Sequence, residues 1–396
     1  MKKKILIPGG KYDDMYLANA AKKQGLYVIT SGYDETAPAH RVSDQYICAD
    51  YSDQEAMLKI ATQEKIDYMC SCANDRGMLS TAYVCEALGL PGHDSYETAL
   101  KIHKKNRFEK LAEEIGLSTP RSVSFSKEED AVHFLESIDK KMIIKPADGC
   151  AGRGISEILP GDDAREAVKN AFSNSLTDII VIEPFIEGQL HSASVYLIDQ
   201  KAVFCFIEEG IVKPTNRYGV AAALSPAKDK AKIEKALIRE FEKVASALNL
   251  VNGKMHTNFI VDEKGDIYIL EMHRRCSGDT YSRFIEASTG VKWSEWIVKA
   301  EMGLDVKDFP KWTPQKENVM YQVLVPPKNG IVRDVVLDNW ITDHLIYSTE
   351  ERKKGSLIAD CRVDFAGILA MRFDSYEEMR HTAEHIQDHV DILMED

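Results

Sequence analysis

The sequence predicts a mixed α/β and α+β protein, with a parallel sheet near its N-terminus and a small β-rich region near its C-terminus. The first hundred residues alternate short apolar runs with amphipathic stretches, which is the pattern of a βαβα unit: KILIPGG, residues 14–24, YVIT, IDYMCSC and residues 79–88. The segments PPKNGIV, KKGSLI and FAGILAM near the end are instead punctuated by Pro and Gly. A chain of 396 residues has room for about two to three domains.

Gly9 and Gly10 follow the first predicted strand. Such glycines let a backbone approach a phosphate, but the full GxGxxG fingerprint is missing, so a tight turn is the favoured interpretation. A nicotinamide-dependent enzyme built on this domain is therefore a weak alternative.

The middle of the chain predicts a β-loop-β-α-β unit. A helix from residue 104 carries Phe108, Leu111 and Ile115 at helical spacing and ends at Gly116. The strand MIIKP, the loop DGCAGRGI, a helix near 164–173 and the strand DIIVIEPFIEG follow. Residues 232–248 place an apolar stripe on one helical face, which predicts packing in the core. A last amphipathic helix is expected from Ser375 to about His389.

Composition excludes several classes of protein. Fifty Lys and Arg against 63 Asp and Glu give a net charge of -13, which disfavours nucleic acid as a partner. No apolar run reaches the roughly 18 residues of a membrane span, and no signal-peptide core is present. The eight cysteines form no CxxC pair, so reduced thiols and a cytoplasmic location are expected.

Lys145 ends an apolar strand and is followed by Gly149, Gly152 and Gly154. Glycines let backbone N–H groups converge on an anion and lysine adds a point charge, so the pair suits a polyphosphate. A hairpin turn with an incidental lysine explains the same residues equally well.

The segment HTNFIVDEKGDIYILEMHRR predicts a hairpin with a polar face. If Val261 pairs with Asp266, Asn258 lies opposite Ile269 and His256 lies opposite Glu271. Alternation then places five polar side chains on one face: His256, Asn258, Glu271, His273 and Arg275. In this register Ile260, Ile267 and Ile269 share the face and indicate that it is covered, which favours a ligand or metal site over a solvated surface.

Glu271 is the strongest candidate ligand for a hard cation, since Mg²⁺ takes one or two carboxylates together with phosphate oxygens. Asn258 and His273 are expected as neutral ligands or as hydrogen-bond partners. Arg275 lies where its planar guanidinium group could hold a carboxylate and a migrating phosphoryl group.

The order of Lys105, Lys145 with its glycine loop, IEPFIEG and EMHRRCSG resembles the ATP-grasp superfamily of carboxylate-amine ligases. PAHRVSD and ALGLPG resemble the N-terminal segments of that family, and FAGILAMRFDSYEEM resembles the C-terminal region of its biotin-carboxylase-like branch. The resemblance implies a Rossmann-like domain over 1–115, a lid over 116–190, a catalytic part over 191–305 and a small α+β part over 306–396.

The resemblance also implies the roles of individual residues, with ATP and Mg²⁺ as cofactors. ATP would be held by Lys105, Lys145, Gly149, Gly152, Gly154, Glu183, Phe185, Ile186 and Leu270. Lys145 and Arg275 would be catalytic, and the metal would be held by Glu271, Asn258 and His273. Apart from the resemblance, Arg217, Tyr218, His256 and Arg283 are candidate substrate residues together with Arg275, and surface roles explain the first four equally well.

Three positions depart from the family pattern. Asn258 stands where the first acidic metal ligand is expected, and His273 replaces the Asn of the ExN ending. The ribose-binding acid falls near Leu190, which leaves Glu187 or His191 as substitutes. A single carboxylate offers less charge to Mg²⁺, so the sequence leaves open whether one or two ions bind. A noncatalytic ATP-binding regulator is an alternative.

The implied reaction activates a small-molecule carboxylate as an acyl phosphate, and an amine then displaces phosphate to form a C–N bond. Lys105, Lys145 and Arg275 would neutralise charge on the transferring group. The expected partners are the acid and the amine, with a homodimer as the commonest oligomeric state.

Overall fold

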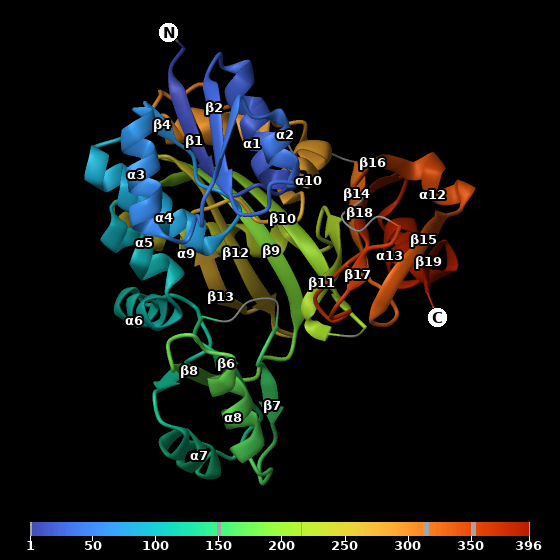
Figure 1. The fold of residues 1–396 in the computed structure, drawn as a ribbon. Coiled ribbons are helices and arrows are strands. Elements are labelled where there is room, and N and C mark those ends of the chain that lie inside the picture. Colours follow the sequence, from blue (N-terminus) through green and yellow to red (C-terminus); the bar gives the residue numbers. More distant parts are fainter. Residues whose placement is uncertain (1, 149–151, 215, 312–316, 350–353, 396) are drawn as a thin grey trace.

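The computed structural model describes residues 2–148, 152–214, 216–311, 317–349 and 354–395. Figure 1 shows a long central sheet with an N-terminal α/β domain over one face, a smaller lobe at one end and the C-terminal segment at the other side. The mixed α/β class predicted from the sequence is confirmed.

The N-terminal domain contains the expected parallel sheet. Its strand order is β3-β2-β1-β4, with β1 Lys4–Pro8, β2 Tyr27–Gly32, β3 Gln45–Cys48 and β4 Tyr68–Met69. Four helices pack around it: α1 Tyr12–Lys23, α2 Pro38–Val42, α3 Gln54–Glu64 and α4 Asp75–Leu88. The next two, α5 Tyr96–His103 and α6 Lys105–Ile115, lead from it to the central sheet, where Ile102 and Phe108 are buried. Because β1 lies between β2 and β4, the chain changes direction across the sheet at β1, and ligands gather at the carboxyl edge of such a point.

The smaller lobe has the predicted β-loop-β-α-β order. Its antiparallel sheet runs β5-β8-β6-β7, with β5 Val123–Phe125, β6 Met142–Pro146, β7 Ser156–Ile158 and β8 Ile180–Pro184. The helices α7 Glu128–Glu136 and α8 Arg165–Ser173 pack on this sheet around Val168 and Ile144.

The central sheet has eight strands in the order β13-β12-β9-β10-β11-β14-β18-β16. Its bounds are β9 Gln189–Ile198, β10 Lys201–Lys213, β11 Asn216–Ser225, β12 Gly253–Val261, β13 Ile267–His273, β14 Asn318–Leu324, β16 Leu345–Thr349 and β18 Gly367–Phe373. One face packs on α9 Lys230–Ala247 through the predicted stripe, with Leu237, Phe241 and Val244 buried. The other face packs on the N-terminal domain and on α10 Tyr281–Thr289 and α11 Trp293–Glu301.

The predicted register of the β12–β13 hairpin was wrong. Val261 pairs with Ile267 and not with Asp266, and an irregularity between Asn258 and Phe259 shifts the pairing by one more residue, so Asn258 lies opposite Glu271 and His256 opposite His273. Ile267 and Ile269 therefore point into the core on the other face of the sheet, and only Ile260 of the three isoleucines lies on the polar side.

The C-terminal segment extends the central sheet, since β14, β16 and β18 all belong to it. A separate three-stranded sheet, β17-β15-β19, is formed by β15 Gly330–Leu337, β17 Leu357–Ile358 and β19 Val390–Met394, with α12 Asn339–His344 beside it. The last predicted helix was too long: α13 spans Tyr376–Glu384, a 3-10 turn follows at Ile386–Asp388, and pairing with β15 makes the final residues a strand. The domain bounds at 115, 190 and 305 stay predictions. No helix in the described ranges is long and apolar enough to cross a membrane.

Candidate active site between two cavities

One row of polar side chains crosses the central sheet. Glu208 pairs with Ser192, Ser192 with Asn258, and Asn258 with Glu271, so four adjacent strands each contribute one residue. Strands lie about 4.8 Å apart, so the row spans roughly 14 Å between its terminal backbones. Neighbouring side chains interact: the Ser192 hydroxyl donates to Asn258 Oδ1 at 2.8 Å, and Asn258 Nδ2 donates to Glu271 Oε1 at 2.9 Å.

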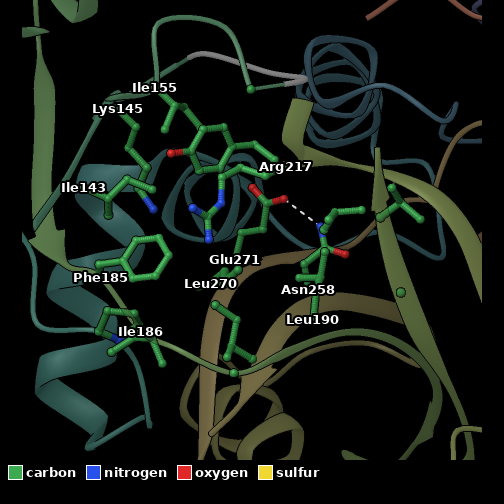
Figure 2. Close-up of a pocket in the computed structure, with 18 of the residues that line it drawn as sticks. Ile143, Lys145, Ile155, Phe185, Ile186, Leu190, Arg217, Asn258, Leu270 and Glu271 are labelled. Carbon is green, nitrogen blue, oxygen red and sulfur yellow. Dashed lines mark hydrogen bonds between the residues drawn. The ribbon is translucent and has the colours of Figure 1, made fainter. Parts of the chain in front are cut away.

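The first cavity lies between the smaller lobe and the central sheet and has a volume of about 500 Å³. Figure 2 shows its apolar walls, which come from both sides: Ile143, Ile155, Phe185, Ile186, Leu190 and Leu270. A flat apolar slot with a few polar groups at one end is the usual form of a small-molecule site.

Two lysines lie at the polar end of this cavity. Lys145 Nζ is 2.7 Å from Glu183 Oε1, and both side chains are largely buried. Burial lowers the pKa of Lys145, but Glu183 outweighs that effect and raises it, so the ammonium stays charged. Burial and the charge of Lys145 lower the pKa of Lys105, which lines the same cavity. Two cations so close together favour a polyanion between them.

Most of the predicted nucleotide residues line the first cavity. They are Lys105, Lys145, Gly152, Glu183, Phe185, Ile186 and Leu270. Gly149 lies outside the described residues. Gly154 adopts a positive φ of 71° beside Asn174 and Pro146 and is not part of the lining, because its Cα packs against the lobe itself.

The two proposed substitutes for a ribose-binding acid do not line the cavity. Glu187 is 75% exposed and lies 3.5 Å from Lys141 Nζ on the surface. His191 points to the opposite face of β9, where its Nδ1 meets the Glu208 carbonyl at 3.0 Å and its ring stacks on Phe259. The alternation of side chains along a strand explains this placement, since Leu190 and Ser192 take the cavity side.

The second cavity has a volume of about 620 Å³ and lies between the central sheet and the carboxyl edge of the N-terminal sheet. Three loops that follow β1, β2 and β4 line it, through Gly10, Asp34 and Asn74. The two cavities share Asn258 and Glu271, together with Tyr218 and Val220. Glu271 therefore lies where a molecule in one cavity meets a molecule in the other.

The residues at this junction fit a hard divalent cation. Glu271 supplies a carboxylate that is 35% exposed. Asn258 lies next to it with Nδ2 on Glu271 Oε1 and its amide oxygen on Ser192, so the amide would offer its oxygen to an ion after turning over. Burial raises the pKa of Glu271, but His273 and Lys105 lower it to far below its usual value, so the carboxylate is ionised. One carboxylate plus an amide, with phosphate oxygens to complete the shell, is a set of donors that Mg²⁺ accepts.

His273 lies between two carboxylates, with Nδ1 3.0 Å from Asp75 Oδ1 and Nε2 3.4 Å from Glu271 Oε1. Burial and Arg275 lower the pKa of His273, and Asp75 and Glu271 outweigh them and raise it. A protonated imidazole has no lone pair to give a metal. Of the two roles left open by the sequence, this geometry favours the hydrogen-bond partner of Glu271.

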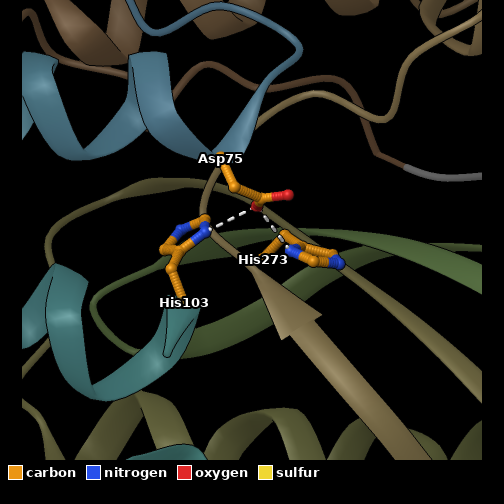
Figure 3. A group of neighbouring side chains, drawn as sticks. All are labelled: Asp75, His103 and His273. Atoms are coloured by element: carbon orange, nitrogen blue, oxygen red, sulfur yellow. Dashed lines mark hydrogen bonds and ion pairs between the residues drawn. The ribbon is translucent and has the colours of Figure 1, made fainter. Parts of the chain in front are cut away.

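Asp75, His103 and His273 form a cluster whose potential ligand atoms all lie within 4.8 Å of one another (Figure 3). His103 Nε2 accepts from the Arg274 N–H at 3.2 Å, so its proton lies on Nδ1 and is donated to Asp75 Oδ1 at 2.8 Å. The same carboxylate oxygen also accepts from Arg275 Nε at 2.8 Å. The oxygen is therefore saturated with donors, and the cluster is a hydrogen-bonded centre rather than a metal site.

The predicted substrate residues separate into different places. Arg275 lines the second cavity, whereas Arg217 lines the first and pairs with Glu157 at 3.0 Å. His256 is buried beneath the cavities, with its Nδ1 2.9 Å from Ser194 Oγ, and lines neither. Arg283 lies outside both, over the ring of Tyr347, while Tyr218 lines both and donates to Glu157 at 2.7 Å.

Several residues in the site were missed by the sequence reasoning. Asp75 begins α4 at the end of the loop that follows β4, so the rule that ligands gather at the carboxyl ends of parallel strands was a usable signal for it. The sequence holds no such signal for Glu208 or Arg380. Glu208 joins the site only through the pairing of β10 with β9, and Arg380 reaches the first cavity from α13.

The glycines after β1 do not form an open phosphate cradle. The Asp14 carboxylate, only 3% exposed, accepts from the backbone N–H groups of Lys11 at 2.9 Å and Ala73 at 3.1 Å. A Cβ at Gly9 would lie 2.6 Å from Asp14 Oδ2, and one at Gly10 would lie 2.6 Å from His40 Nε2. Close packing in a tight turn explains both glycines, and a buried anion already fills the place of a dinucleotide phosphate.

A family model for the ATP-grasp domain matches residues 102–279, which span both lysines, the first cavity and the Glu271 hairpin. Residues 102–279 are an ATP-grasp domain. The expectation drawn from the motif order is thus confirmed for this part of the chain.

Solved structures resemble this chain over its whole length. The L-amino acid ligase from Bacillus licheniformis superposes with a TM-score of 0.84 at 19% identity over 100% of both chains. Phosphoribosylglycinamide synthetase from Anaerococcus prevotii gives a TM-score of 0.79 at 18% identity, over 99% of this chain and 100% of that one. At these identities the likeness establishes the fold alone.

Among curated proteins, the C-terminal section of the carbamoyl phosphate synthase large chain from Methanopyrus kandleri is 24% identical over 212 residues. That match covers 52% of this chain and 39% of the relative. The large chain from Ralstonia nicotianae is 22% identical over 80% of this chain but only 32% of its own length. This chain thus spans less than half the length of these relatives.

Proposed function

We propose that this protein is an ATP-dependent carboxylate-amine ligase that activates a small-molecule acid as an acyl phosphate and joins it to an amine. The observation that carries the proposal is the position of Glu271 and Asn258, which both cavities share. A nucleotide in the first cavity and a carboxylate in the second would meet there, as phosphoryl transfer between two bound molecules requires.

The residues of this chain divide the work. The apolar walls of the first cavity, including Phe185 and Leu270, receive the base, and Lys105 and Lys145 receive the phosphates. Arg275 lines the second cavity beside Glu271 and neutralises charge on the acid. Gly152, above the first cavity, belongs to the loop that would close over the phosphates and exclude water.

Mg²⁺ would be held by Glu271 and Asn258 and would supply charge neutralisation on the phosphate oxygens. His273 fixes the Glu271 carboxylate, and Asp75 in turn fixes His273. Metal ligands are commonly oriented in this way by partners behind them.

The proposal is tested by incubating the protein with ATP, Mg²⁺ and pooled carboxylates, with hydroxylamine as the trapping amine, and by measuring ADP and hydroxamate. We expect ADP to form only when a carboxylate is present. ATP binding without ADP formation from any pool would contradict the proposal and favour the noncatalytic regulator. NADH binding tighter than ATP binding would favour the nicotinamide enzyme. The turn after β1 argues against that enzyme, because the Asp14 carboxylate already accepts its backbone N–H groups.

A cytoplasmic location and a homodimer are proposed with the ligase. Every cysteine in the described ranges is a free thiol, which fits a reducing compartment. Size-exclusion chromatography with light scattering tests the dimer.

A further inference from the structure

Glu208 is a buried carboxylate in the second cavity that the proposed reaction does not use. It stands at the end of the polar row opposite to Glu271, on β10, and it is 1% exposed. Its Oε2 has no hydrogen-bond partner among the described residues, while Ser192 on the neighbouring strand hydrogen-bonds to the carboxyl group. Buried polar atoms are almost always paired, so an unpaired carboxylate oxygen on a residue that lines a cavity indicates a missing partner.

A second unpaired group lines the same cavity. The hydroxyl of Tyr281, at the start of α10, is buried and also lacks a partner among the described residues. The Tyr281 ring packs edge-on against Phe206 at 6.0 Å between ring centroids, and Phe206 lies two residues before Glu208 on the same face of β10, so the two groups are near one another. Both oxygens can accept hydrogen bonds. Burial raises the pKa of Glu208 to about 8 in the ligand-free protein, and a cation bound beside it would lower that pKa, so Glu208 would supply negative charge in the complex.

The ligand group that satisfies both is a primary ammonium, which has three N–H donors and a positive charge. A phosphate or a second carboxylate would be repelled. Asp13 and Asp14, at the start of α1, and Asp34, after β2, add carboxylates at the far wall. Four cationic side chains line other parts of the same cavity: Lys11, Lys213, Arg275 and Arg362. We propose that Glu208 and Tyr281 form a subsite for the amino group of the substrate in the second cavity, and that this substrate is an amino-bearing small molecule.

The inference rests on the proposed ligase function in one respect, because it treats the bound molecule as the substrate. Its test measures binding and does not require turnover. The probes are matched sets: L-leucine, 4-methylpentanoate, which lacks the amino group, and 3-methylbutylamine, which lacks the carboxylate. The set of L-alanine, propionate and ethylamine repeats the comparison with a shorter skeleton. Each is titrated calorimetrically into the full chain in the presence of a nonhydrolysable ATP analogue and Mg²⁺.

We expect wild-type protein to bind an amino-bearing probe at least tenfold more tightly than the probe without the amino group. Glu208→Gln should abolish that difference, and Tyr281→Phe should reduce it while keeping the ring. Glu234→Gln, on α9 at the other face of the sheet, is the matched control and should leave it intact. The leucine and amine arms distinguish an amino acid from a simple amine.

Equal binding of all probes by wild type, or an amino preference that survives in Glu208→Gln, would overturn the subsite. ADP formation is measured in parallel. If no acid supports ADP formation while the amino preference depends on Glu208, the ligase fails and the subsite stands. If ADP forms and the amino preference is absent, the ligase function stands and the subsite fails.

Discussion

Asp75 and Arg275 form a bidentate ion pair, in which Arg275 Nε lies 2.8 Å from Asp75 Oδ1 and Arg275 Nη2 lies 2.9 Å from Asp75 Oδ2. Two hundred residues apart in the sequence, they join the N-terminal domain to the end of the Glu271 hairpin. Because Asp75 also holds His273, this one carboxylate sets the positions of both His273 and Arg275. The guanidinium expected to meet a substrate is thus already oriented by a protein carboxylate.

Asp75→Asn should lower the rate of ADP formation by about 10²-fold, since Arg275 and His273 both lose the charge that orients them. Asp75 is 42% exposed, so the loss of stability is expected to be moderate, about 1–3 kcal/mol. Glu97→Gln breaks the exposed pair with Arg107 and should change stability by less than about 0.5 kcal/mol. Steady-state kinetics and denaturant unfolding measure both quantities, and a normal rate in Asp75→Asn would contradict the positioning role.

Glu271→Gln should reduce turnover by about 10²- to 10³-fold while the fold is kept, because the amide preserves the shape but not the charge shared by the two cavities. Binding of Mn²⁺ in the presence of the ATP analogue, followed by electron paramagnetic resonance, should weaken in parallel. Glu263→Gln lies in the exposed turn of the same hairpin and serves as the control. Unchanged Mn²⁺ binding in Glu271→Gln would show that the ion is held elsewhere.

Lys145→Met should raise KM for ATP about tenfold or more and should also destabilise the protein. Its removal leaves Glu183, which is 7% exposed, without the partner at 2.7 Å, and breaking a buried pair costs about 3–5 kcal/mol. Adding Glu183→Gln should restore much of the stability but not the affinity for ATP. A double-mutant cycle of unfolding free energies checks this, and additive effects would contradict the coupling.

The sequence was sufficient for the elements and for the first cavity, because the strand MIIKP, the glycine loop and the hairpin are local patterns. Lys105, Lys145 and Glu183 could be named since each lies in or beside such a pattern. The face of the hairpin could not be read correctly, because a one-residue shift of the pairing next to the turn reverses the side on which Ile267 and Ile269 lie.

The second cavity was beyond sequence reasoning for a different reason. It is assembled from loops of the N-terminal sheet and from strands whose partners are far apart along the chain. Glu208 meets Ser192 and Asn258 only through pairing of β10 with β9 and of β9 with β12. Likewise, β14 and β18 join the central sheet although the composition of residues 306–396 suggested a separate small unit.

The pH dependence of stability gives an independent measurement of Glu208. Burial raises the pKa of Glu208 to about 8 in the folded protein, from about 4.5 in an unfolded chain. Between these values the folded protein holds a proton that the unfolded chain lacks, so stability falls as pH rises from about 5 to 8, by up to about 1.4 kcal/mol per unit. Glu208→Gln has no proton to lose, and its stability relative to wild type should therefore increase with pH over this range. Asp13 and Asp14, whose pKa values are raised to about 7 and about 6, are common to both proteins and cancel in the comparison. Denaturant unfolding at pH 5, 6, 7 and 8 measures the difference, and a constant difference would show that Glu208 is ionised throughout.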